Sequence, residues 1–338
     1  MSQTTPAAPD IESGELEVKD SAAAQRRSRL IRTLQTQAIA GVLIVLVIIF
    51  SIASPYFFTL DNFINMGGTF AILGIMAVSQ TFLVVSKGID ISIGSVAAVA
   101  GVLLGFFYSN GVNIWIGVVL SLLAGLAIGM LNGLLIVRLG LDPLVATLGA
   151  YSIFQGLAFV ISGTKTLVIS DAAFNFLGAG NILGIPFTLV LFILVLGAAI
   201  FVERRTSVGR AIFAIGGNQE AARLSGIRVK RIRITLYALS GLTAAVAGIL
   251  LASQLGTSSP NVGTTYLLSV VTAVVLGGSS LDGGRGSLLG TLLAVAILGV
   301  LQNGFALLAF SSFAQQIVLG ALLIAAVTMD TATRRRRK

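Results

Sequence analysis

The side chains that most often carry out chemistry in proteins are largely missing from this sequence. It contains no histidine and no cysteine, which excludes disulfides, His or Cys metal sites, thiol nucleophiles and imidazole acid/base chemistry. A nucleotide-binding P-loop requires a Gly-Lys pair, and none of the lysines follows a glycine. The glycine cluster at 283–290 lacks the spacing and the preceding strand of a dinucleotide site. We therefore expect no catalytic residue, no metal site and no cofactor bound by this chain.

Two aspartates stand in segments that echo one another. Residues 89–95 (IDISIGS) and 281–287 (LDGGRGS) share the order apolar, Asp, three residues, Gly, Ser, and each opens an apolar run. Repeats that bring broken helices to the bilayer midplane occur in transporters, and a carboxylate buried in a bilayer usually has a function. The echo therefore suggests an internal repeat of two halves. The alternative is that both segments are ordinary cytoplasmic loops in which Asp or Ser caps a helix.

The longest polar interval between apolar runs is 203–233. It holds eight of the 22 basic residues and two acids, so the positive-inside rule places it in the cytoplasm. Within it, Asn218 can cap a helix of about two turns, Glu220 falls in the first turn, and Gly226 can end it. Such a helix could serve as a docking surface for a cytoplasmic partner, or the interval could be a basic tether that only fixes orientation.

The elements that carry these segments are membrane helices. With 56% hydrophobic and 10% charged residues and a mean hydropathy of +0.98, the chain has too much apolar surface for a soluble domain of its size. Its net charge of +9 reflects basic residues that flank apolar runs, and it does not indicate nucleic acid. The apolar runs predict ten spans at 38–54, 63–85, 91–109, 114–137, 143–162, 185–202, 233–255, 264–280, 286–304 and 310–329.

The distribution of charge supports an even number of spans. With ten crossings and both termini cytoplasmic, every basic residue except Lys165 lies in the cytoplasm. The sequence thus predicts an all-α polytopic membrane protein with a largely disordered cytoplasmic tail (1–37), a transmembrane domain (38–330) and a basic cytoplasmic tail (331–338). The first apolar run is expected to be an anchor rather than a removed signal. The long external segment 162–184 could contact an extracytoplasmic partner.

Several stretches, taken together and in this order, resemble the ribose-type sugar permeases of ABC importers across about Phe58 to Met329. They are GIDISIGS (88–95), NGLLI (132–136), PLVATLG (143–149), GRAI (209–212), GGNQEAARLSGI (216–227) and LGG (276–278) through Gly286-Ser287. Lys87 departs from the family, which commonly has a small residue there. A lysine deep in the bilayer would have to reach water or pair with Asp90.

The resemblance implies roles for particular residues. The helix that couples the permease to the ATPase would be formed by Gly217, Asn218, Gln219, Glu220, Ala221, Ala222, Arg223, Leu224, Ser225 and Gly226. Candidate residues of the translocation pathway are Asp90, Ser92, Gly94, Ser95, Asn132 and Asp282. The implied partners are a cytoplasmic ATP-binding cassette subunit, which binds the ATP and Mg²⁺, a second permease subunit and an extracytoplasmic sugar-binding protein. The implied location is the bacterial inner membrane.

Two other classes of function compete with this interpretation. A stand-alone facilitator or channel for a small polar solute would transport without any partner, which flux measurements on vesicles containing only this chain can test. An intramembrane enzyme is less well supported, because the sequence lacks acid/base and metal-binding constellations. The leading hypothesis is a permease that alternates access to a monosaccharide while a separate ATPase supplies the energy.

Overall fold

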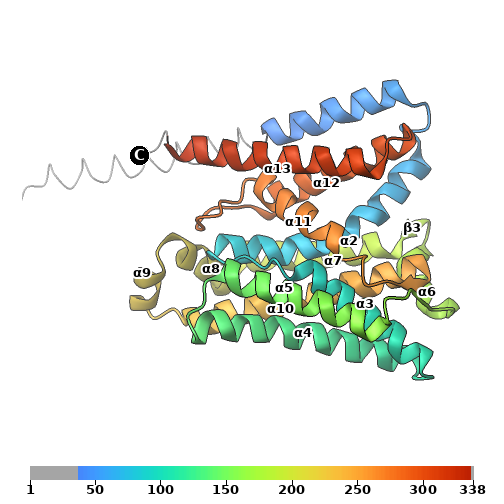
Figure 1. The fold of residues 1–338 in the computed structure, drawn as a ribbon. Coiled ribbons are helices and arrows are strands. Elements are labelled where there is room, and N and C mark those ends of the chain that lie inside the picture. The colour runs from blue at the N-terminus through green and yellow to red at the C-terminus, as the bar shows by residue number, and fades with distance from the viewer. Residues whose placement is uncertain (1–36, 336–338) are drawn as a thin grey trace, which may run out of the picture.

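The computed structural model describes residues 37–335. The chain forms a bundle of helices with a few two-residue strands (Figure 1). After a first helix at Gln37–Ala53 the elements are α2 (Leu60–Val85), α3 (Ile93–Ser109), α4 (Ile114–Arg138), α5 (Pro143–Ser162), β1 (Leu167–Val168), α6 (Ala172–Ala179), β2 (Asn181–Ile182), β3 (Ile185–Pro186), α7 (Phe187–Arg205), α8 (Ser207–Gly217), α9 (Gln219–Leu224), α10 (Val229–Leu255), β4 (Thr257–Ser258), α11 (Thr264–Leu276), α12 (Leu288–Leu307) and α13 (Ser312–Arg335).

Each of the ten predicted spans coincides with a helix. Within the described residues, six helices are long and apolar enough to cross a bilayer, namely α2, α4, α5, α7, α10 and α12. Four further apolar helices are shorter: Gln37–Ala53, Ile93–Ser109, Thr265–Leu276 and Ser312–Thr328. The chain is therefore a polytopic membrane protein, and crossing by the four shorter helices stays a prediction. The predicted tails lie mostly outside the described residues.

The centre of the bundle is formed by α2 and α10. In the most apolar 18 residues of α2, 89% of the residues are buried, whereas in the corresponding stretches of α5 and α7 only 17% are buried. α2 therefore runs through the interior, while α5 and α7 lie at the periphery. α4 packs closely on α10 through glycines on both helices. A Cβ at Gly133 would lie 3.0 Å from the Cα of Ile234, and one at Gly129 would lie 3.0 Å from the Cα of Gly241. The glycines thus allow the two helix backbones to pack tightly.

Two pairs of side chains join α2 to α12 near both ends of the helices. Asn62 and Asn303 exchange hydrogen bonds, with each amide nitrogen donating to the other's oxygen at 3.0 and 2.8 Å. About 19 residues further along α2, the hydroxyl of Thr81 lies 2.9 Å from that of Thr291. The two helices run antiparallel, and the stretch from Asn62 to Thr81 on α2 faces the shorter stretch from Thr291 to Asn303 on α12. The two pairs fix the relative position of α2 and α12.

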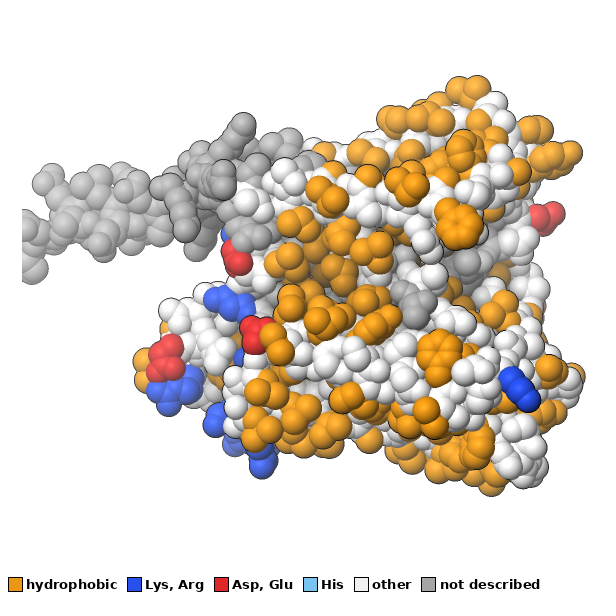
Figure 2. Space-filling model, viewed as in Figure 1, with side chains coloured by type: hydrophobic (Ala, Val, Ile, Leu, Met, Phe, Trp, Pro, Cys, Tyr) orange, Lys and Arg blue, Asp and Glu red, His pale blue; other side chains and the backbone are white. Residues whose placement is uncertain are grey.

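The interval 203–233 is much more helical than expected from the sequence. α7 continues to Arg205, α8 fills 207–217, and α10 begins at Val229. α8 and α9 project at one end of the bundle, and the end of α13 and the start of the first helix lie on the same side (Figure 1). This is the arrangement that an even number of crossings requires. On the face shown in Figure 2, Lys and Arg side chains gather at this end.

Candidate functional site

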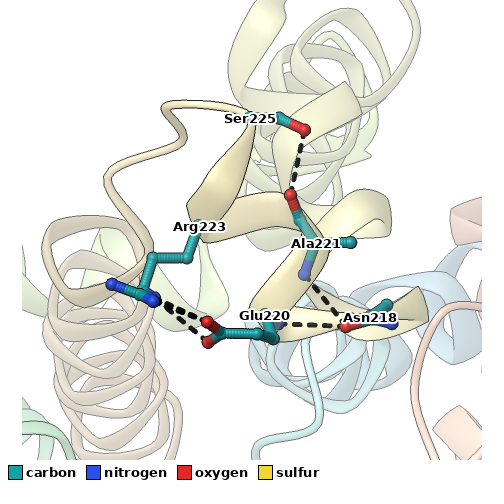
Figure 3. Close-up of polar contacts among 5 residues, drawn as sticks. All are labelled: Asn218, Glu220, Ala221, Arg223 and Ser225. Atoms are coloured by element: carbon teal, nitrogen blue, oxygen red, sulfur yellow. Dashed lines mark hydrogen bonds and ion pairs between the residues drawn. The ribbon is translucent and has the colours of Figure 1, made fainter.

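The local structure predicted around residue 218 is confirmed. The side-chain oxygen of Asn218 accepts hydrogen bonds from the backbone N–H groups of Glu220 and Ala221, both at 3.0 Å, and this caps the start of α9 (Figure 3). The last residue of the helix is Leu224, Ser225 is its C-cap, and Gly226 follows with a φ of +81°. This left-handed conformation favours glycine, because other residues crowd their Cβ against the backbone. Asn218 and Gly226 therefore limit α9 to its six residues.

The outer surface of α9 is exposed to solvent. Among the predicted coupling residues only Ala222 is buried, and all the others from 217 to 226 are exposed. Glu220 and Arg223 form an ion pair in which Nε of Arg223 lies 3.0 Å from a carboxylate oxygen (Figure 3). Hydrogen bonding by Arg223 lowers the pKa of Glu220, so the carboxylate is ionised near neutral pH. Leu224, which is 75% exposed, adds an apolar side chain to this face.

The inner side of α9 rests on a small apolar cluster. Ala222 is buried together with Ile215 of α8 and Val229 of α10, and Ile227 and Ile232 pack against them. Because its only buried side chain is a methyl group, α9 lies directly on its neighbours, while its polar side chains point outward. The arrangement is a short, capped, solvent-exposed helix on an apolar base, which suits contact with another protein rather than catalysis.

Gly216, at the end of α8, contacts the backbone of Val85 at the end of α2 and of Gly284 between α11 and α12. We call these three residues the glycine junction. The N–H of Gly284 donates to the carbonyl oxygen of Val85 at 2.8 Å. A Cβ at Gly216 would overlap both groups and would lie 3.0 Å from the Cα of Gly284. The segment with α9 is thus in direct contact with the end of α2 and with the α11–α12 connection, and the two echoed sequences lie just after this end of α2 and within that connection. Sequence reasoning missed α8, although Val208, Ile212 and Ile215 have helical spacing.

Asp90 lies in a network of buried hydrogen bonds. It is fully buried, and its Oδ1 accepts from the N–H and hydroxyl of Ser92 at 2.9 and 2.6 Å. Its Oδ2 accepts from the hydroxyl of Ser240 at 2.7 Å. The amide nitrogen of Asn132 donates to the Ser92 hydroxyl at 2.8 Å. Three of the candidate pathway residues therefore come together, and they join the start of α3 to α4 and α10. Ser240, from α10, was not singled out in the sequence.

The other candidate pathway residues lie apart from this network or at its edge. The Ser95 hydroxyl donates to the carbonyl oxygen of Ser92 at 2.9 Å. A Cβ at Gly94 would overlap the carbonyl oxygen of Gly263, so this glycine allows α3 to approach the start of α11. Asp282 is exposed, unlike Asp90. Lys87 is also exposed, so its ammonium group reaches water and does not require Asp90 as a partner. The internal repeat of two halves stays a prediction.

Comparison with known proteins identifies the family. The pattern of the family described as "Branched-chain amino acid transport system / permease component" matches residues 62–327. The chain is 39% identical over 290 residues to the ribose import permease protein RbsC of Bacillus subtilis, a match that covers 85% of this chain and 90% of the relative. It is 38% identical over 292 residues to the Escherichia coli protein of the same name, covering 85% and 91%.

A third relative is named for another sugar. The L-arabinose transport system permease protein AraH of Escherichia coli is 38% identical over 293 residues, covering 86% of this chain and 89% of the relative. No solved structure matches the chain. The family pattern spans most of the bundle, from the start of α2 into α13, and includes α8, α9 and the Asp90 network. The chain therefore belongs to the branched-chain amino acid transport system permease component family, whose members include permease subunits of ABC importers for sugars.

Proposed function

We propose that this protein is the transmembrane permease subunit of an ABC importer and moves a monosaccharide, ribose or a related sugar, across the bacterial inner membrane. The three relatives described above are named for ribose or L-arabinose, which supports a sugar over the amino acids in the family's description. The chain has no Gly-Lys pair for a nucleotide site. We infer that a separate cytoplasmic subunit binds ATP and Mg²⁺ and hydrolyses the ATP, and that this chain is not itself an enzyme.

The observation that carries the proposal is the exposed helix α9 on its apolar base. We assign Gly217 to Gly226 as the coupling segment, which docks in a groove of the ATPase. Its carboxylate, guanidinium and leucine side chains face outward, while Ala222 is held by Ile215 and Val229. Movement of the ATPase would displace α8 and α9 together, because both share this apolar cluster, and the glycine junction would pass the displacement to α2 and α12.

The proposal includes further partners. A second permease subunit, identical or related, completes the pathway, and a soluble sugar-binding protein docks on the outer surface. The segment between α5 and α7 provides surface for that contact, since Leu183 at the turn between β2 and β3 is 98% exposed and Val168 is 62% exposed. We propose that Asp90, Ser92, Gly94, Ser95, Asn132 and Asp282 belong to the helices that border the pathway and to their connections.

Reconstitution with the ATPase and the sugar-binding protein tests this function. Ribose uptake should require all components and ATP, and Glu220→Lys should abolish both uptake and the stimulation of ATP hydrolysis by the binding protein. The substitution reverses the charge beside Arg223 on an exposed surface, so membrane insertion should be unchanged. Gln254→Leu, at an exposed glutamine on α10, is the matched control. Normal uptake by Glu220→Lys, or ribose flux through vesicles that contain this chain alone, would contradict the proposal.

A further inference from the structure

A cavity lies between four helices in the half of the bundle away from α8 and α9. Its volume is about 570 Å³, and α2, α11, α12 and α13 line it. Gln302 stands 14 residues after the start of α12, or about 21 Å along the helix axis, and Ser312 is the first residue of α13. A volume of this size is within the usual range for small-molecule sites. In Figure 1, α11, α12 and α13 form a layer above the rest of the bundle.

The lining of the cavity is polar but uncharged. Eight of its twelve residues carry a hydroxyl or a carboxamide, and none is charged. The polar groups include Gln302, Gln315, Gln316, Tyr266, Ser269 and Ser312. Carboxamides both donate and accept hydrogen bonds, as do the hydroxyl groups of a polyol. The rings of Phe70 and Tyr266 add apolar surface that suits the C–H faces of a sugar ring.

Solutes with charge fit this lining poorly. A free amino acid carries an ammonium and a carboxylate group, and moving either from water into a site without a partner of opposite charge is costly. The three glutamine amides line the cavity, where they can both donate hydrogen bonds to a ligand and accept them. The chemistry of the lining therefore selects an uncharged, hydroxyl-rich solute.

A second polar group continues the same face of α2 toward the cytoplasmic end. Gln80 lies seven residues after Leu73, which lines the cavity. Seven residues are almost two helical turns, so both side chains lie on one face about 10 Å apart along the axis. Gln80 is fully buried, and within the described part of the chain neither of its amide atoms has a partner. A buried amide without hydrogen bonds costs free energy, and a passing hydroxyl group would satisfy it.

We propose that the cavity binds an uncharged monosaccharide through the amides of Gln302, Gln315 and Gln316, and that Gln80 is the next contact inward. The sugar would enter this cavity after the binding protein releases it, and this part of the inference rests on the proposed function. It assigns solute contacts to α2, α12 and α13. The Asp90 network, whose carboxylate oxygens are occupied by Ser92 and Ser240, then holds neighbouring helices together.

Uptake by the reconstituted complex gives the first test. Gln302→Leu, Gln315→Leu and Gln316→Leu should each lower the efficiency of ribose uptake by about tenfold, equivalent to about 1.4 kcal/mol. The coupling segment is unaltered in these variants, so the binding protein should still stimulate ATP hydrolysis. Glu220→Lys, in contrast, should lose both activities, and Gln254→Leu should lose neither. Unchanged uptake in all three cavity variants would overturn the proposal, even though the proposed function would stand.

Site-directed labelling gives an independent test that does not require transport. The natural chain has no cysteine, so Ser312→Cys introduces a single thiol at the cavity. Ribose should slow its reaction with an uncharged maleimide, whereas leucine should not. Ser170→Cys, on the exposed segment after β1, is the control and should react equally with and without ribose. Equal protection by ribose and leucine, or none by either, would refute the assignment. This measurement tests binding in the cavity even if a glutamine variant fails to assemble with the ATPase.

Discussion

The glycine junction predicts that two adjacent glycines at the end of α8 respond differently to the same substitution. Gly216→Ala places a methyl group against the carbonyl of Val85 and the backbone of Gly284, with the Cα of Gly284 at 3.0 Å. Gly217→Ala places the same group in open space. Gly216 and Gly217 are the last two residues of α8, so the effect of alanine on helix propensity is similar at the two positions. In the free energy of unfolding of the permease alone, the difference between the two variants isolates the backbone contact, and for uptake Gly216→Ala is compared with the unaltered permease, because Gly217 belongs to the proposed coupling segment.

The size of the effect follows from what surrounds the added methyl group. Heavy atoms closer than 3.0 Å to a Cβ essentially never occur, and here the close atoms belong to the backbone and cannot rotate away. α8 or the 283–284 connection must shift, and overpacking of this kind costs about 1–3 kcal/mol. Gly217→Ala has no such clash, and it should change the free energy of unfolding by less than about 1 kcal/mol, in the stabilising direction.

Two assays check this prediction. Unfolding of the purified permease in detergent should show that Gly216→Ala is less stable than Gly217→Ala. In the reconstituted complex, Gly216→Ala should reduce ribose uptake for each ATP hydrolysed, because α8 no longer lies against the connections into α3 and α12. Equal stability of the two variants would show that the junction is not tightly packed, and uptake by Gly216→Ala equal to that of the unaltered permease would show that the junction does not transmit force.

Three further predictions concern other buried or strained groups. Gln80→Met should raise the free energy of unfolding by about 1–3 kcal/mol, since it removes a buried amide without partners, and it should lower ribose uptake; a less stable Gln80→Met protein would show that the amide is satisfied. Ser240→Ala removes one hydrogen bond to Asp90 and should destabilise the detergent-solubilised permease by about 1–3 kcal/mol in thermal unfolding; unchanged stability would show that this bond does not hold α10 to the start of α3. Gly226→Ala forces a Cβ into a left-handed conformation, at a cost of about 1–2 kcal/mol, so stimulation of the ATPase by the binding protein should fall; full stimulation would contradict the role of this turn.

The sequence predicted the positions of the helices because each is a long apolar run with polar ends. It also predicted α9, since Asn218 and Gly226 mark a helix boundary through local chemistry that needs no tertiary contact. The composition correctly indicated a polytopic membrane protein, in keeping with the family, and the binding of ATP by a separate subunit stays a prediction. The number of crossings and the roles of the individual coupling and pathway residues stay predictions.

Contacts between distant segments could not be derived in this way. Ser240 lies 150 residues from Asp90, and nothing in its neighbourhood marks it among the other small residues of α10. The cavity glutamines lie in two runs that were interpreted as spans, and only the packing of four helices brings them to one space. α8 was missed because the interval 203–233 was interpreted from its basic residues as a polar loop. The apolar positions of α8 nevertheless repeat with a helical period.

The paired contacts between α2 and α12 limit how the bundle can open. Asn62 with Asn303 and Thr81 with Thr291 clamp the two helices near opposite ends, so neither helix can slide or tilt freely against the other. They should behave as one stiff strut that crosses the full thickness of the protein. If the cavity opens, we expect α11 and α13 to move rather than α2 against α12, which makes those two helices the natural place for probes of motion.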